Sequence, residues 1–185
     1  MTEAIAIGRG IESARPLFFE DPISPENVDA MATVISAIGV PVATGERAVS
    51  LPEFQALLNA GVAVLRPDVC AVGGLTPSRK AAVLAEAAGA HIAPHNPLGP
   101  VSTAACLQLD LSSSAFLIQE FPSFNIEGNE DSMVTVPLKV DAGYLIAPDE
   151  PGIGVTLVPN IAELHPAAPR NLTPWIGYDR SVVAR

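Results

Sequence analysis

Cysteines and basic residues are both scarce in this sequence. Two cysteines, Cys70 and Cys106, occur among its 185 residues. They are too few for a disulfide framework and are not spaced as metal ligands, so buried free thiols are expected. Lysine and arginine together number 10 against 20 aspartate and glutamate residues, which gives a net charge of −10. This acidic balance disfavours binding to nucleic acid and to anionic membrane surfaces.

Long apolar runs are missing as well. No apolar stretch reaches the roughly 18 residues that a membrane-spanning helix requires. The segment 1–16 has no basic region before its apolar stretch, whereas a secretory signal has one. We therefore expect a cytoplasmic protein. Hydrophobic residues are abundant, at 49 % against 16 % charged. This composition predicts a folded α/β or helical protein with a substantial core.

Short apolar segments alternate with amphipathic segments along the chain. Strands are predicted at 17–19, 40–43, 62–65, 91–93 and 115–119, and helices at 2–14, 26–38, 51–60, 77–88 and 101–110. Short apolar strands that alternate with helices are typical of a parallel sheet buried on both faces. The fold class is therefore predicted to be α/β.

Each predicted strand is followed by an ionisable residue. These residues are Glu20, Glu46, Asp68, His95 and Glu120, and one βα unit separates each from the next. Any one of them alone is explained by the polarity of loops. The carboxyl ends of parallel strands meet at one edge of a sheet, where α/β enzymes hold their active sites. Five in succession therefore favour a functional site at this edge.

His95 is the candidate proton-transfer group of this site. It lies between Pro94 and Pro97, which keep their neighbours out of helical conformation and place the imidazole at a rigid strand end. Taken alone, His95 is better explained as a surface or structural histidine. Carboxylates gathered around it would repel one another unless a cation neutralised them, which indicates a hard divalent metal. Mg²⁺ suits oxygen ligands of this kind better than Zn²⁺.

Five motifs in chain order carry a family resemblance. FFEDP at 18–22, TGER at 44–47, RPDVCAVGG at 66–74, APHNPLGP at 93–100 and IQE at 118–120 resemble successive barrel-strand motifs of the enolase superfamily. Within it they resemble the mandelate racemase group, most closely its galactonate dehydratase-like sugar acid dehydratases. The resemblance implies that Glu20 and Glu46 are Mg²⁺ ligands, that His95 and Asp68 form a catalytic dyad, that Glu120 is the site glutamate of the last strand and that Arg47 contacts the substrate.

The resemblance also implies a partial (β/α)₈ TIM barrel. Residues 1–150 correspond to its last five βα units, and residues 151–185 to a tail that would pack on a capping domain. The capping domain, the first three strands and the aspartate that serves as the remaining metal ligand have no counterpart in the sequence. Full-length members of such a family are expected to be homo-oligomers.

The implied reaction is dehydration of a small-molecule sugar acid. A proton is removed next to the substrate carboxylate and water is eliminated, which gives a 2-keto-3-deoxy acid. Asp68 would hold His95 in one tautomer. Two alternatives stay open: a racemase or another acid-sugar dehydratase of the same superfamily, and a non-catalytic barrel remnant. Whether this chain is itself an enzyme is therefore left open, as is the identity of the sugar acid.

Overall fold

Four short parallel strands form the central sheet of the protein. In a computed structural model, the structure describes residues 1–122, 133–168, 175–176 and 182–183. The strands are β1 (Phe19–Glu20), β2 (Val42–Thr44), β3 (Val64–Leu65) and β4 (His91–Ile92), in the order β1-β2-β3-β4. Each pairs in parallel with the next along the chain, which requires a crossover connection between successive strands.

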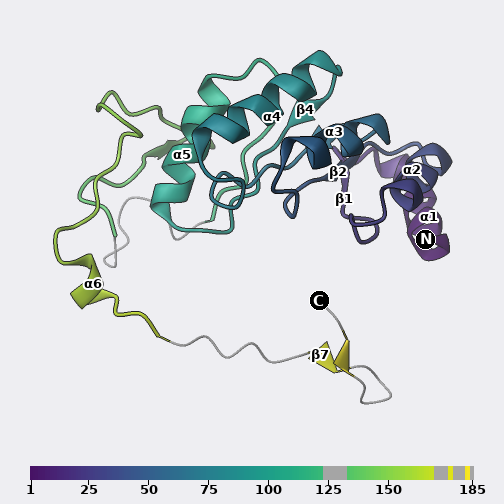
Figure 1. The fold of residues 1–185 in the computed structure, drawn as a ribbon. Helices are drawn as coiled ribbons and strands as arrows, with labels where there is room; N and C mark the ends of the chain where they lie inside the picture. Colours follow the sequence, from purple (N-terminus) through teal and green to yellow (C-terminus); the bar gives the residue numbers. More distant parts are fainter. Residues whose placement is uncertain (123–132, 169–174, 177–181, 184–185) are drawn as a thin grey trace.

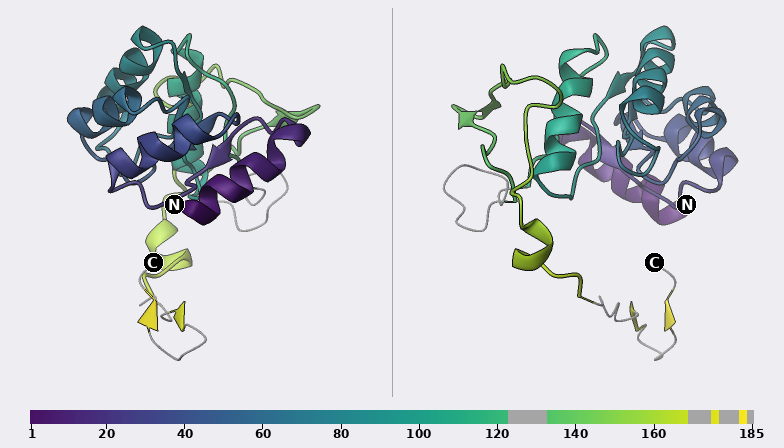
Figure 2. Two further views of the ribbon diagram at one scale, coloured as in Figure 1. Left: turned by 90° about the vertical axis from the view of Figure 1, so that its right-hand side faces the viewer. Right: turned by 60° about the vertical axis from the view of Figure 1, so that its left-hand side comes forward.

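Helices α2 (Val28–Ala37), α3 (Leu51–Asn59) and α4 (Leu75–Ala87) supply these connections. Before β1 lies α1 (Thr2–Ile11), continued by the 3₁₀ helix η1 (Glu12–Ala14), and after β4 lies α5 (Pro100–Leu111). The Asn27 side chain accepts a hydrogen bond from the Ala30 amide at the start of α2, and prolines open α3 and α5. Figure 1 shows α3 and α4 along the same side of the strands, and Figure 2 shows the helices following one another around them. The predicted helices and the α/β class are confirmed.

The fifth predicted strand is shorter than expected. Residues 115–119 make a single parallel bridge, Ile92 with Phe116, beside β4. The Ile92 amide donates to the Ala115 carbonyl at 2.8 Å, and the Leu117 amide donates to the Ile92 carbonyl at 2.9 Å. No strand among the described residues pairs with the other edge of this segment, so the ladder there has support from one side only. The count of five βα units stays a prediction.

The sheet separates two apolar clusters. The larger one packs the helices against the strands and includes Met31, Phe54, Leu65 and Ile92, each no more than 1 % exposed. On the other side lie the small buried side chains of Ala43, Val64 and Ala93, with Phe18, Ala63 and Leu117 packed against them. Both faces of the central strands are therefore buried, which explains why their residues are apolar without alternation.

The remaining elements are small. They are the hairpin of β5 (Val140–Asp141) and β6 (Tyr144–Leu145), helix α6 (Ile161–Leu164), and the pair β7 (Trp175–Ile176) and β8 (Val182–Val183). An antiparallel bridge joins Val134 to Leu157, and these residues lie on either side of the predicted boundary at residue 150. The division of the chain there stays a prediction. No helix in the described ranges is both long and apolar enough to span a membrane.

Gly45, directly after β2, is required by its backbone conformation. Its φ is +131°, and a Cβ at this position would lie 3.2 Å from the backbone nitrogen of Arg66. Arg66 is at the end of the neighbouring strand, and its amide donates to the Thr44 carbonyl at 3.0 Å. A side chain at Gly45 would therefore strain both the turn and the strand pairing beside it.

Replacing Gly45 with alanine should lower the free energy of unfolding by about 1–2 kcal/mol, because an L-residue is strained at this φ. The matched control is Gly10→Ala, since Gly10 lies in α1 with no atom within 4 Å of the added Cβ. That change should stabilise the protein by about 0.5–1 kcal/mol. Urea unfolding followed by circular dichroism measures both. Equal effects of the two substitutions would contradict the strain at Gly45.

Candidate active site

The five predicted site residues lie at the same edge of the sheet. Contacts join them into two groups, one containing Glu46, His95 and Asp68, and the other joining Glu20 to Glu120 through an arginine. The charges of Glu46 and Glu120 also act on Glu20, which places the two groups near each other. The arrangement agrees with the strand-end pattern of the sequence.

His95 has a carboxylate at each ring nitrogen. Its Nδ1 is 3.0 Å from Asp68 Oδ2, and its Nε2 is 3.2 Å from Glu46 Oε2. The parallel pairing of β3 and β4 continues here as a bridge between Asp68 and His95, and the His95 amide donates to the Pro67 carbonyl. Of these two contacts, the one between Nδ1 and Asp68 has hydrogen-bond geometry.

Asp68 is the more firmly held of the two carboxylates. Its Oδ1 accepts hydrogen bonds from the backbone amides of Cys70, at 2.8 Å, and Ala71, at 3.1 Å. The side chain is buried, whereas that of Glu46 is 27 % exposed. Asp68 therefore fixes the orientation of the His95 ring through Nδ1, and Nε2 is the nitrogen that faces the open part of the site.

Arg66 is a site residue that sequence reasoning did not assign. Its side chain is 6 % exposed, with Nε 2.5 Å from Glu20 Oε1 and Nη2 2.7 Å from Glu120 Oε2. The Nε contact with Glu20 is close but lacks hydrogen-bond geometry, since Nε has no hydrogen-bond partner. The signal that could have found Arg66 is its position two residues before Asp68, because alternate residues of an extended chain share a face.

Asn96 is a second unassigned residue of the site. It is fully buried, and its backbone amide donates a hydrogen bond to Glu120 Oε2 at 2.9 Å. Its side-chain nitrogen donates to Thr103 Oγ1 at 2.8 Å and to the Glu120 carbonyl oxygen at 3.2 Å. Glu120 is therefore fixed by both Asn96 and Arg66. A partial signal was its position directly after His95.

Crowding of negative charge is evident at Glu20. Burial raises the pKa of its carboxyl, Arg66 opposes this, and the charges of Asp21, Glu46 and Glu120 raise the pKa further. The described residues contain no group of three or more metal-binding side chains. Two carboxylates from neighbouring strand ends nevertheless fit Mg²⁺, which keeps several of its waters and uses one or two protein carboxylates. Glu20 and Glu46 as ligands stay a prediction.

Arg47, the predicted substrate contact, lies beside the site. Its Nη1 is 3.3 Å from Glu26 Oε1, and its Nε is 4.0 Å from Glu46 Oε1. The side chain is 47 % exposed. Such exposed ion pairs are weak, so the guanidinium is available to another anion. Its role in substrate binding stays a prediction.

The chain resembles known proteins throughout its described core. A family model described as "Enolase C-terminal domain-like" matches residues 1–161. The chain belongs to this family. It is 38 % identical over 154 residues to a D-galactonate dehydratase of Variovorax paradoxus (strain S110), covering 80 % of this chain and 40 % of that enzyme. The enolase-superfamily resemblance is thereby confirmed, and the chain spans about two fifths of the relative's length.

Solved structures of the same family share the fold. An enolase from Agrobacterium radiobacter, with bound Na and L-malate, superposes with a TM-score of 0.88 at 30 % identity, covering 98 % of this chain and 49 % of that one. An enolase from Pantoea ananatis, with bound D-gluconate and Mg, gives a TM-score of 0.80 at 30 % identity, covering 88 % and 39 %. The sheet and its helices are thus the C-terminal portion of an enolase-type barrel.

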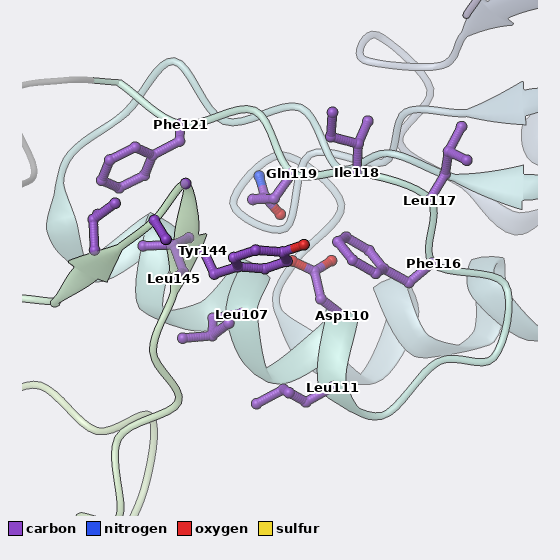
Figure 3. Close-up of a pocket in the computed structure, with 13 residues that line it drawn as sticks. Leu107, Asp110, Leu111, Phe116, Leu117, Ile118, Gln119, Phe121, Tyr144 and Leu145 are labelled. Atoms are coloured by element: carbon purple, nitrogen blue, oxygen red, sulfur yellow. The ribbon is translucent and has the colours of Figure 1, made fainter.

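A separate apolar cavity of about 540 Å³ lies between α5, residues 116–121 and the β5–β6 hairpin. None of the predicted site residues lines it. Figure 3 shows the Asp110 carboxyl at this cavity, near the rings of Phe116 and Tyr144. Asp110 is 6 % exposed, and neither of its carboxyl oxygens has a hydrogen-bond partner. Burial raises the pKa of Asp110 to about 8.

The raised pKa of Asp110 predicts a pH-dependent stability. Its pKa is about 8 in the folded protein and about 3.9 in an unfolded chain. The folded state therefore holds a proton that the unfolded state has released, and stability should fall as the pH rises from about 4 to 8. Between pH 5 and pH 8, the melting temperature of Asp110→Asn should fall less than that of the wild type.

The control for this measurement is Asp149→Asn, which removes an exposed carboxyl. Thermal melts at pH 5 and pH 8, followed by circular dichroism, should show the wild-type pH dependence in this control. An identical pH dependence in Asp110→Asn and the wild type would contradict the raised pKa.

Proposed function

We propose that this chain is the C-terminal barrel portion of a Mg²⁺-dependent sugar acid dehydratase. The enzyme would remove the proton next to the substrate carboxylate and eliminate water, which gives a 2-keto-3-deoxy acid. The observation that carries the proposal is the series Glu46, His95 and Asp68 at adjacent strand ends. Its support is the identity of 38 % to a D-galactonate dehydratase. A cytoplasmic location and homo-oligomeric assembly of the full-length protein are further parts of the proposal.

His95 would be the residue that exchanges the proton with the substrate. Because Asp68 occupies Nδ1 at 3.0 Å, the proton would move at Nε2. Nε2 now faces Glu46 at 3.2 Å, so Glu46 has to turn away before a substrate carbon can approach. The buried Asp68 carboxylate would stabilise the imidazolium that forms.

The remaining residues would bind and orient the substrate. Mg²⁺, when bound, supplies a Lewis acid for the negative charge that develops on the substrate carboxylate. Glu20 and Glu46 would hold it. Arg47 would contact the substrate from the exposed side of the site. Glu120, fixed by Asn96 and Arg66, would present a carboxyl group of defined orientation from the last strand segment.

A non-catalytic barrel remnant is the second candidate function. The observation that favours it is that both proposed metal ligands already have cationic or hydrogen-bonding partners, Arg66 for Glu20 and His95 for Glu46. Within the enzyme class, racemases and other acid-sugar dehydratases are the alternatives. Structures similar to this chain contain L-malate in one case and D-gluconate in another, so the family resemblance alone does not select one acid.

The isolated chain should bind Mg²⁺ no more tightly than about 1 mM, or about −4 kcal/mol. Two carboxylates hold the ion weakly, because Mg²⁺ is reluctant to give up its waters. Isothermal titration calorimetry measures the affinity, and Glu20→Gln should weaken it further. Tight stoichiometric binding that persists in Glu20→Gln would show that the ligands are assigned incorrectly.

The proposed function is tested by completing the barrel. The chain is fused to the N-terminal portion of the Variovorax paradoxus D-galactonate dehydratase and assayed for 2-keto acid formation from galactonate, gluconate and arabinonate. We expect the fusion to be active and the unfused chain inactive. His95→Asn should reduce the rate of the fusion by a factor of about 10² or more, the range of general acid–base catalysis.

The matched control is His91→Asn, because His91 is an exposed histidine on the same strand and has no site contact. It should leave the rate of the fusion unchanged. A fusion whose rate is indifferent to His95→Asn would refute the catalytic role of this residue. An inactive fusion that is correctly folded would favour the non-catalytic remnant.

A further inference from the structure

Arg66 is the only residue that connects Glu20 with Glu120 in the described part of the chain. Its guanidinium lies almost entirely out of solvent, with a carboxylate 2.5 Å from Nε and another 2.7 Å from Nη2. A buried cation of this kind is stable only with such partners. The site therefore contains a permanent positive charge of its own, held next to a carboxylate that the proposed function gives to Mg²⁺.

The two carboxylates of Arg66 are held differently. Glu120 accepts an aligned hydrogen bond from Arg66 and a second one from the Asn96 amide. Glu20 accepts no hydrogen bond from the described residues, contacts Nε without hydrogen-bond geometry and has a side chain that is 39 % exposed. Of the two, Glu20 is therefore the partner whose separation from Arg66 costs less.

Arg66 and a divalent cation would compete for Glu20. The carboxylate oxygen that Arg66 contacts is Oε1, so a Mg²⁺ ion coordinated to that oxygen would lie close to the guanidinium. Two positive charges on one carboxylate also repel each other, because the buried guanidinium cannot lose its proton. Metal binding should therefore move Glu20 away from Arg66, while Glu120 keeps it.

We propose that Arg66 is a positioning residue that holds Glu20 and Glu120 in the metal-free site and releases Glu20 when a divalent metal binds. This rests on the proposed function only in taking Glu20 as a metal ligand. Arg66 thus sets the affinity of the site for metal, and it keeps Glu120 in place before and after metal binding.

The test measures metal affinity in the 185-residue chain itself. Mn²⁺ serves as the probe, because it prefers the same oxygen ligands and its free form is quantified by electron paramagnetic resonance. Arg66→Gln removes the competing charge and should bind Mn²⁺ about 3- to 10-fold more tightly than the wild type. Arg66→Lys retains a charge and should bind with an affinity between the two. Competition with Mg²⁺ extends the result to the proposed metal.

The direction of the change separates competition from a merely structural role. If Arg66 only supported the fold, its loss would disorder Glu20 and weaken Mn²⁺ binding. Lys80→Gln is the control for net charge, because it removes a positive charge from an exposed position of α4, and it should leave the affinity unchanged. Unchanged or weaker binding by a folded Arg66→Gln would overturn the proposal.

A measurement on the wild type decides the matter if Arg66→Gln does not fold. In a chain labelled with ¹⁵N and ¹³C, Mg²⁺ should shift the Arg66 Nε–Hε signal and the Glu20 carboxyl signal with one midpoint. The signal of the Asn96 backbone amide, which donates a hydrogen bond to Glu120, should not shift. If Mg²⁺ shifts the Glu20 carboxyl signal but leaves the Arg66 signal unchanged, the competition is refuted and the proposed metal site is not. If Mg²⁺ moves neither the Glu20 nor the Glu46 carboxyl, the metal site fails, and the proposed function and this inference fail with it.

Discussion

The site depends on the neutralisation of negative charge at one edge of a parallel sheet. Four carboxylates follow strands in this chain, namely Glu20, Glu46, Asp68 and Glu120. Parallel pairing brings strand ends together whatever their charge, so the carboxylates would oppose folding without positive groups between them. His95 and Arg66 are placed between pairs of these carboxylates. The buried guanidinium of Arg66 thus stabilises a geometry that the sheet alone would make unfavourable.

The contacts follow the order of the strands. In one group, Glu20 ends β1, Arg66 follows β3, and Glu120 lies in the segment after α5. In the other, Glu46 lies after the end of β2 and His95 after the end of β4. In barrels of this type, side chains from alternate strands share a layer. The two groups are therefore a consequence of the pleat and register of the sheet, and one strand end, 66–68, supplies a residue to each.

Much of this arrangement was predictable from the sequence, because each strand is apolar and each ends in a polar residue. The helices were predictable from hydrophobic periodicity, and the common edge of the site residues from the ionisable residue after each strand. The enolase-type fold was predictable from five motifs. The role of Arg66 was not predictable in the same way, because its partners Glu20 and Glu120 are distant in sequence. Asn96 contacts the Glu120 carboxylate through its backbone amide, which carries no sequence signal. The fifth strand was overestimated because an apolar pattern does not reveal that no strand among the described residues pairs with its outer edge.

Asp110 contrasts with the carboxylates of the site. It lies near the end of α5, and its carboxyl is buried beside an apolar cavity without a hydrogen-bond partner. At the strand ends, by contrast, the carboxylates of the site have partners from other strand ends. The difference lies in what the fold supplies nearby: the strand ends bring His95 and Arg66 to their carboxylates, whereas the fifth segment offers Asp110 only Phe116 and other mainly apolar neighbours. Burial therefore favours the protonated form of Asp110, whereas the carboxylates of the site lie beside His95 and Arg66.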